Sequence, residues 1–175
     1  MANYRRVWIP GGTYFFTVAL ADRQSALLTS RIAELRAAFR TARTARPFAT
    51  EAIVILPDHI HAIWTLPPGD ADYATRWSQI KATFSRALPA GERASASRAR
   101  RRERGIWQRR YWARAIVDEN DFAAHADYIH INPVKHGLAA SAREWPWSSF
   151  HRYVRDGVLA ETWAEPVTAL SRSVG

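Results

Sequence analysis

Residues 48–66 read FATEAIVILPDHIHAIWTL. Two runs rich in β-branched and other apolar side chains, 48–56 and 59–66, are separated only by Pro57 and Asp58. Runs of this composition with so short a break predict two antiparallel strands joined as a hairpin. The elements predicted on either side of this hairpin are expected to complete a sheet with its strands.

Four further elements are predicted outward from the hairpin: a strand over 14–21, a helix from Thr29 or Ser30 to about Arg46, a helix over 73–88 and a strand over 106–117. The order β-α-β-β-α-β predicts a ferredoxin-like α+β fold, in which two helices cover one face of a four-stranded antiparallel sheet. An additional helix is predicted over 118–132. It is capped by Asp118 or Asp121 and ended by Pro133, because the residue before a proline avoids helical geometry.

The chain of 175 residues, 47% of them apolar, is long enough for one domain with a single core. We expect that domain over 1–153, with a basic loop over 88–105, followed by a partly disordered tail over 154–175. The absence of cysteine excludes disulfides, thiolate metal sites and cysteine nucleophiles, and it fits a cytoplasmic protein. The sequence shows no secretory leader and no apolar run long enough to span a bilayer.

The chain carries 25 basic and 16 acidic residues, a net charge of +9. Much of the excess lies between Leu88 and Trp112, where eight arginines face two glutamates. Such a positive field predicts a polyanionic partner, nucleic acid first and an anionic membrane surface second, with a solvated loop as the alternative. Aromatic residues 107, 111 and 112 favour nucleic acid, because bases stack on such rings. The candidate DNA-binding residues are Arg5, Arg6, Arg101, Arg102, Arg109, Arg110 and Arg114.

Two histidines, His59 and His61, open the second strand of the hairpin. Successive side chains of a strand alternate between its faces. Both imidazoles are therefore expected beside Ile63 on one face, with Ile60 and Ala62 on the other. Imidazoles at this spacing can converge on one metal ion. A hydrogen-bonded pair at the sheet surface explains the same pattern, so the pair alone leaves both interpretations open.

The predicted additional helix carries Tyr128 and Asn132, which are neighbours on its surface because they are four residues apart. One interpretation is structural, a packing tyrosine with an asparagine at the helix end. The other is chemical, because a tyrosine hydroxyl can attack phosphorus and form a covalent ester. The amide oxygen of Asn132 would then complete a site begun by His59 and His61. Two nitrogens and one oxygen suit Mg²⁺ or Mn²⁺ bound to a phosphate.

Five longer segments follow one another over roughly residues 4–153: YRRVWIPGGTYFFTVAL, LPDHIHAIWTLP, WQRRYWARAI, DYIHINPVKHGL and WPWSSFHRY. Together they resemble the REP-associated tyrosine transposases, of the HUH single-tyrosine insertion-sequence transposase superfamily. The resemblance implies that Tyr128 is the nucleophile and that His59 and His61 bind metal. It makes Asn132 the third ligand, at a position where insertion-sequence relatives commonly carry glutamine.

The resemblance also implies a reaction, a cofactor and a partner. The tyrosine would cut single-stranded DNA beside palindromic hairpins, using Mg²⁺ or Mn²⁺, and leave a 5′-phosphotyrosine and a free 3′-OH. No membrane partner is implied. A monomer and a homodimer both stay open, since insertion-sequence relatives are typically dimers that supply the tyrosine helix in trans.

Three more histidines lie near Tyr128 in the sequence. His125 is expected on the tyrosine's side of the helix, and His130 and His136 on other faces or in the following turn.

Two other functions stay open. One alternative function is a non-catalytic nucleic-acid binder on the same sheet. The other is a metal phosphodiesterase that activates water and does not need Tyr128.

Overall fold

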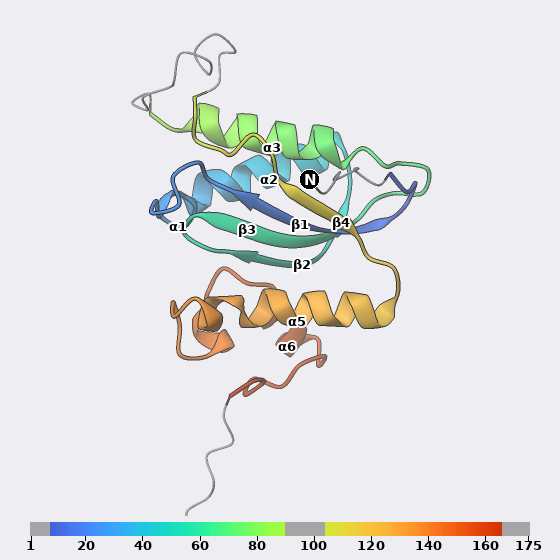
Figure 1. The fold of residues 1–175 in the computed structure, drawn as a ribbon, viewed down its shortest axis with the longest axis vertical. Coiled ribbons are helices and arrows are strands. Elements are labelled where there is room, and N and C mark those ends of the chain that lie inside the picture. The colour runs from blue at the N-terminus through green and yellow to red at the C-terminus, as the bar shows by residue number, and fades with distance from the viewer. Residues whose placement is uncertain (1–7, 90–103, 166–175) are drawn as a thin grey trace, which may run out of the picture.

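The computed structural model describes residues 8–89 and 104–165 (Figure 1). Four strands form one antiparallel sheet in the order β2-β3-β1-β4. The elements are β1 Thr13–Ala19, α1 Leu27–Ser30, α2 Ile32–Ala45, β2 Ala49–Ile55, β3 His59–Thr65, α3 Tyr73–Ala87, β4 Trp112–Ala115, α5 Glu119–Lys135, a 3₁₀ turn Ala142–Glu144 and α6 Phe150–Arg155. The predicted ferredoxin-like α+β fold with an additional helix is confirmed.

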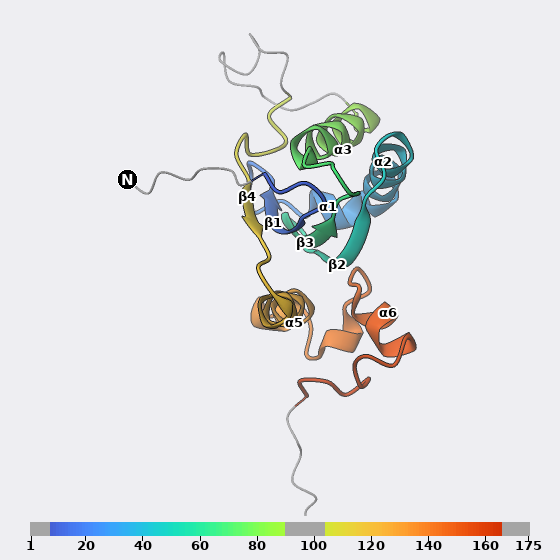
Figure 2. The same ribbon diagram turned by 90° about the vertical axis from the view of Figure 1, so that its right-hand side faces the viewer.

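Helices cover both faces of the sheet, with α2 and α3 on one side and α5 on the other (Figures 1 and 2). The side chains of β3 alternate between these two layers. Ile60 and Trp64 belong to the core under α2 and α3. Ile63 belongs to the core under α5, together with Ile129. Within the two described ranges, no helix combines the length and the apolar character needed to cross a membrane.

The chain that follows α5 returns to the sheet and covers the outer edge of β2. Ile55 N donates to Trp147 O at 2.9 Å, and Ser149 N donates to Ile53 O at 2.8 Å. The Trp145 indole donates to Ile55 O at 2.9 Å. Backbone groups that are satisfied in this way are no longer open to pairing with the edge of another sheet.

Residues beyond 153 continue the folded structure for some distance. Helix α6 (Phe150–Arg155) crosses the domain boundary expected at 153. Arg143 Nε lies 3.1 Å from Glu165 Oε1, which ties the end of the described chain to the 3₁₀ turn. Most of the predicted basic loop, 90–103, and the end of the predicted tail, 166–175, lie outside the described residues.

Helix α5 does not end at Asn132 as the sequence predicted. It continues to Lys135, with Pro133 inside its last turns. A proline near the end of a helix removes one backbone donor, and tertiary packing can offset that loss. His136 N donates to Asn132 O at 3.0 Å. Gly137 then ends the helix with a φ of 67°, a conformation that favours glycine.

The predicted strand over 106–117 is two shorter pieces. Trp107 makes an isolated bridge with Leu20, and β4 itself spans only Trp112–Ala115. Residues 108–110, Gln-Arg-Arg, are exposed between them. This polar stretch has no apolar side chain to bury against the sheet, so the strand pairing is interrupted there.

Thr29 and Ser30 do not cap the helix that follows them. Both residues lie inside the short helix α1, and α2 begins only at Ile32. Thr29 Oγ1 donates to Ala26 O at 3.1 Å, and Ser30 Oγ donates to Leu27 O at 3.3 Å. Hydroxyls that bond to carbonyls of the preceding turn are not available to cap the next helix.

His130 is a buried histidine that makes the stability of the fold dependent on pH. Its Nε2 lies 2.9 Å from Ser149 Oγ, and burial lowers its pKa from 6.5 to about 4. As the pH falls below 6.5, the unfolded chain binds a proton here that the folded protein does not, so stability decreases. For this residue alone we expect a loss of about 2 kcal/mol between pH 7 and pH 5.

Urea unfolding of wild type and His130→Phe in the presence of EDTA checks this expectation. The variant should show the shallower decrease in unfolding free energy with falling pH. An identical pH dependence in the two proteins would contradict it.

Candidate functional site

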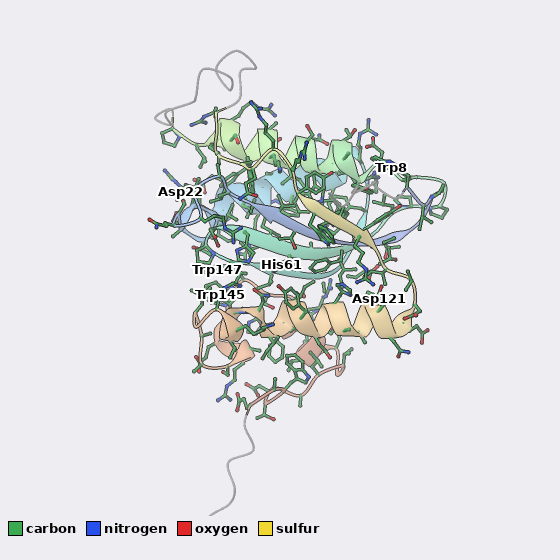
Figure 3. All side chains as sticks on the ribbon, viewed as in Figure 1. Trp8, Asp22, His61, Asp121, Trp145 and Trp147 are labelled. Carbon is green, nitrogen blue, oxygen red and sulfur yellow. The ribbon has the colours of Figure 1, made fainter. Side chains whose placement is uncertain are left out.

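The histidine pair lies, as predicted, on one face of β3, and that face looks toward α5. His59 and His61 keep 5% and 4% of their surface exposed. Their ring centroids are 4.9 Å apart. Figure 3 shows His61 between the sheet and α5. The site is therefore built on a rigid inner strand of the sheet rather than on a loop.

A different partner holds the Nδ1 atom of each imidazole. Asp58 Oδ1 lies 2.7 Å from His59 Nδ1, and the other oxygen of Asp58 lies 2.8 Å from Arg23 Nε. Thr17 Oγ1 lies 2.8 Å from His61 Nδ1. A hydrogen bond at Nδ1 fixes the ring orientation and leaves Nε2 as the nitrogen that can bind a ligand.

The two histidines are held in their neutral form. Burial lowers the pKa of His61 from 6.5 to about 3, and repulsion from His59 and His136 adds to this. Burial also lowers the pKa of His59, although the hydrogen bond with Asp58 opposes the shift. A neutral imidazole is the form that binds a metal ion, so both rings are ready to do so at neutral pH.

Tyr128 projects from α5 onto the histidine pair. Its ring centroid lies 5.1 Å from that of His61 and 6.1 Å from that of Phe15. Lys135 Nζ lies 5.0 Å from the centroid of the tyrosine ring. The tyrosine keeps 38% of its surface exposed. It can therefore meet a large substrate while touching a histidine of its own chain.

Asn132 lies on α5 between two residues that contact the histidine pair. Tyr128, one helical step before it, contacts His61. His136, one step after it, has its ring centroid 5.2 Å from that of His59. Asn132 Oδ1 and His61 Nε2 are both buried and have no hydrogen-bond partner among the described residues. A bound cation would satisfy both atoms, whereas a purely structural pair would leave them destabilising.

Three histidines on α5 or directly after it occupy different surroundings. His136 lies in the turn after the helix, as expected, but its closeness to His59 was not anticipated. Its spacing of four residues from Asn132 is the signal in the sequence that could have revealed it. His125 lies on the tyrosine's side, with Nδ1 2.8 Å from Asp121 O. His130 faces α6, away from the site.

Three of the candidate DNA-binding arginines lie within the described residues. Arg109 and Arg110 are exposed in the segment before β4, and Arg114 is exposed on β4 itself. Arg114 lies 3.0 Å from Asp121 Oδ1, which shows that its side chain is on the α5 face of the sheet. The remaining candidates lie outside the described residues: Arg5, Arg6, Arg101 and Arg102.

A ferredoxin-like sheet with a histidine pair on an inner strand, faced by a helix that carries a tyrosine and an amide, defines the class of HUH single-tyrosine transposases. The chain is 48% identical over 164 residues to a Haemophilus influenzae protein provisionally named a REP-associated tyrosine transposase, covering 93% of each. It is 44% identical over 171 residues to the REP-associated tyrosine transposase of Escherichia coli, covering 98% of this chain and 96% of the relative. The chain therefore belongs to the REP-associated tyrosine transposases, and it is an enzyme of DNA transesterification.

A solved structure of the same family agrees with this assignment. It is described as a REP-associated tyrosine transposase bound to a REP hairpin. The two structures superpose with a TM-score of 0.81 at 44% sequence identity, over 98% of this chain and 96% of the other. No protein-family model matches the chain. The resemblance inferred from the sequence segments is confirmed.

Proposed function

We propose that the chain is a metal-dependent endonuclease and strand transferase for single-stranded DNA. It recognises palindromic-repeat hairpins and cleaves through a 5′-phosphotyrosine intermediate. One observation carries the proposal: His61 Nε2 and Asn132 Oδ1 are buried without hydrogen-bond partners among residues 8–89 and 104–165, beside the exposed Tyr128. His61 Nε2 and Asn132 Oδ1 can each donate a lone pair to a cation, and a cation bound there could hold a phosphate beside Tyr128.

The donor atoms suit a divalent cation. His59 and His61 would supply nitrogen and Asn132 oxygen, a set that Mg²⁺ or Mn²⁺ accepts with positions left for phosphate oxygens. When bound, the cation would polarise the scissile phosphate and orient it. Within the described ranges, no group of three or more His, Cys, Asp or Glu side chains is placed to hold a metal ion. We therefore assign the third ligand position to the amide oxygen of Asn132.

Tyr128 supplies the nucleophile. Its phenolic oxygen loses a proton and attacks phosphorus, while the bond from phosphorus to the 3′ oxygen breaks and that oxygen takes up a proton. The 5′ end of one fragment is then esterified to the tyrosine, and the other fragment ends in a free 3′-OH that can reverse or redirect the transfer. Lys135 Nζ, 5.0 Å from the tyrosine ring centroid, places positive charge beside the incoming phosphate.

We propose that one chain carries a complete site and acts as a monomer, because Tyr128 contacts His61 of its own chain. The hairpin substrate is proposed from the solved relative at 44% identity, which is bound to a REP hairpin. The exposed side chains of Arg109 and Arg110 are candidates for contact with the hairpin stem.

The test uses a DNA hairpin with a single-stranded flank, labelled at its 5′ or its 3′ end, and a denaturing gel. With Mn²⁺ or Mg²⁺, the wild-type protein should form a covalent adduct that carries the 3′ label, and it should release the 5′-labelled fragment. With EDTA, neither product should form. An adduct that carries the 5′ label would overturn the proposed polarity. Binding without cleavage, across several hairpins and both metals, would favour a non-catalytic binder.

Asp58→Ala is expected to weaken binding of Mn²⁺ to the metal-free protein by about 10- to 100-fold. Asp58 fixes the ring of His59 through a 2.7 Å hydrogen bond at Nδ1. Without it the ring can rotate and the nitrogen is a weaker ligand. Titration calorimetry with Mn²⁺ measures the affinity directly. Asp22→Ala is the matched control, because Asp22 accepts a hydrogen bond from Gln24 N in the neighbouring loop. Equal affinity in Asp58→Ala and wild type would refute this role.

A further inference from the structure

An exposed tryptophan lies on the edge strand of the sheet. Trp112 is the first residue of β4 and keeps 52% of its surface exposed. Most other tryptophans of the described chain are buried or half-buried, and Trp64 and Trp77 are fully buried. An aromatic ring of this size held at the surface of a strand is unusual in a chain that buries most of its other indoles.

The strand register places Trp112 in one row with the candidate site. Trp112 pairs with Thr17 of β1, and Thr17 pairs with His61 of β3. Paired residues of antiparallel strands project to the same face, so the indole, the hydroxyl and the imidazole share a face. Thr17 Oγ1, 2.8 Å from His61 Nδ1, supports this direction. Arg114, two residues beyond Trp112, supports it too, because it reaches Asp121 of α5.

The residue next to Trp112 on β4 points to the opposite face of the sheet, which agrees with this assignment. Ala113 is 6% exposed and belongs to the core under α2 and α3. Trp112 therefore lies on the α5 side of the sheet. Two strand spacings separate it from His61, roughly 10 Å between the backbones. A phosphate held at His61 would have its flanking nucleotide within reach of the indole.

We propose that Trp112 is the stacking platform for a base that flanks the scissile phosphate. The inference rests on the proposed function and adds a substrate-positioning residue to it. The face of an indole accepts any base, so the contact would orient the strand without selecting its sequence. The neighbouring positive charge of Arg110 suits the backbone of the same strand. A base stacked on Trp112, next to a phosphate held at His61, would fix the direction in which the DNA strand crosses the site.

The experiment places 2-aminopurine at each position beside the cleavage point of a single-stranded hairpin flank. The protein is Tyr128→Phe, so that the strand stays intact. Stacking on an indole quenches this fluorophore, and one position should be quenched on binding. In Trp112→Ala the quenching should disappear, and affinity should fall about tenfold to a hundredfold. Trp112→Phe should restore most of the affinity, which shows that the loss comes from the ring and not from misfolding.

Trp8→Ala is the matched control. Trp8 is 48% exposed, but its ring stacks on Tyr73 at 4.7 Å, which places it on the α3 side of the molecule. This variant should keep the quenching at the cleavage point. If wild type forms the adduct but Trp112→Ala binds and quenches as well as its parent, the platform is refuted and the proposed function stands. If wild type neither binds nor cleaves any single strand, the proposed function itself has failed.

Discussion

Tyr128→Phe is expected to abolish the covalent protein–DNA adduct and to lower strand cleavage by at least about a thousandfold. The substitution removes the attacking oxygen and keeps the ring. Tyr128 contacts His61 and Phe15 through its ring, which phenylalanine also has, so the fold and the metal site should persist. Hairpin affinity should therefore be unchanged, and an adduct gel together with a binding assay measures the two effects separately.

Tyr153→Phe is the matched control for this substitution. Tyr153 also loses only a hydroxyl, one that donates to Glu51 O of β2 at 3.1 Å, and its ring contacts His130 rather than the histidine pair. The loss should cost about 1 kcal/mol of stability and leave adduct formation intact. Cleavage that continues at the wild-type rate in Tyr128→Phe would instead show that water is the nucleophile, as in a metal phosphodiesterase.

The parts of the fold that could be predicted from the sequence are those in which local pattern and tertiary packing agree. The hairpin strands lie within one residue of the predicted bounds, because Pro57 and Asp58 separate two apolar runs and the sheet buries both faces of β3. The helix over 73–88 matches α3 because apolar residues at helical spacing are the ones it buries, and Asp72 caps it. Local rules failed where tertiary contacts outweighed them: Pro133 inside α5 and the interrupted strand before Trp112.

The candidate site divides in the same way. Strand parity predicted that His59 and His61 share a face, and helical spacing predicted that Tyr128 and Asn132 are neighbours. The partners that hold the imidazoles were not predicted, because Thr17 comes from a different strand and the pairing register is a tertiary property. His136 was missed as well, since its place depends on how far the helix continues past the proline.

His61→Phe is expected to eliminate metal-dependent cleavage, a loss larger than the roughly 10- to 100-fold that removal of an outer partner costs. The phenyl ring can take the place of the imidazole that stacks on Phe15 at 5.6 Å, whereas the nitrogen that would bind the cation is lost. In wild type, Mn²⁺ at about 100 times its dissociation constant should raise the unfolding free energy by about 2.7 kcal/mol. In His61→Phe this stabilisation should disappear, which thermal unfolding with and without Mn²⁺ measures.

The metal-free stability of His61→Phe separates a ligand from a structural histidine. His61 Nε2 is a buried atom without a hydrogen-bond partner in the described part of the chain. Removing this unsatisfied polar atom should stabilise the fold, which offsets the loss of the hydrogen bond with Thr17. The unfolding free energy should therefore change by less than about 1.5 kcal/mol. His130→Phe removes an equally buried imidazole that faces α6, and it should keep both Mn²⁺ stabilisation and cleavage. If His61→Phe retained Mn²⁺ stabilisation, the cation would bind elsewhere and the proposed ligand set would be wrong.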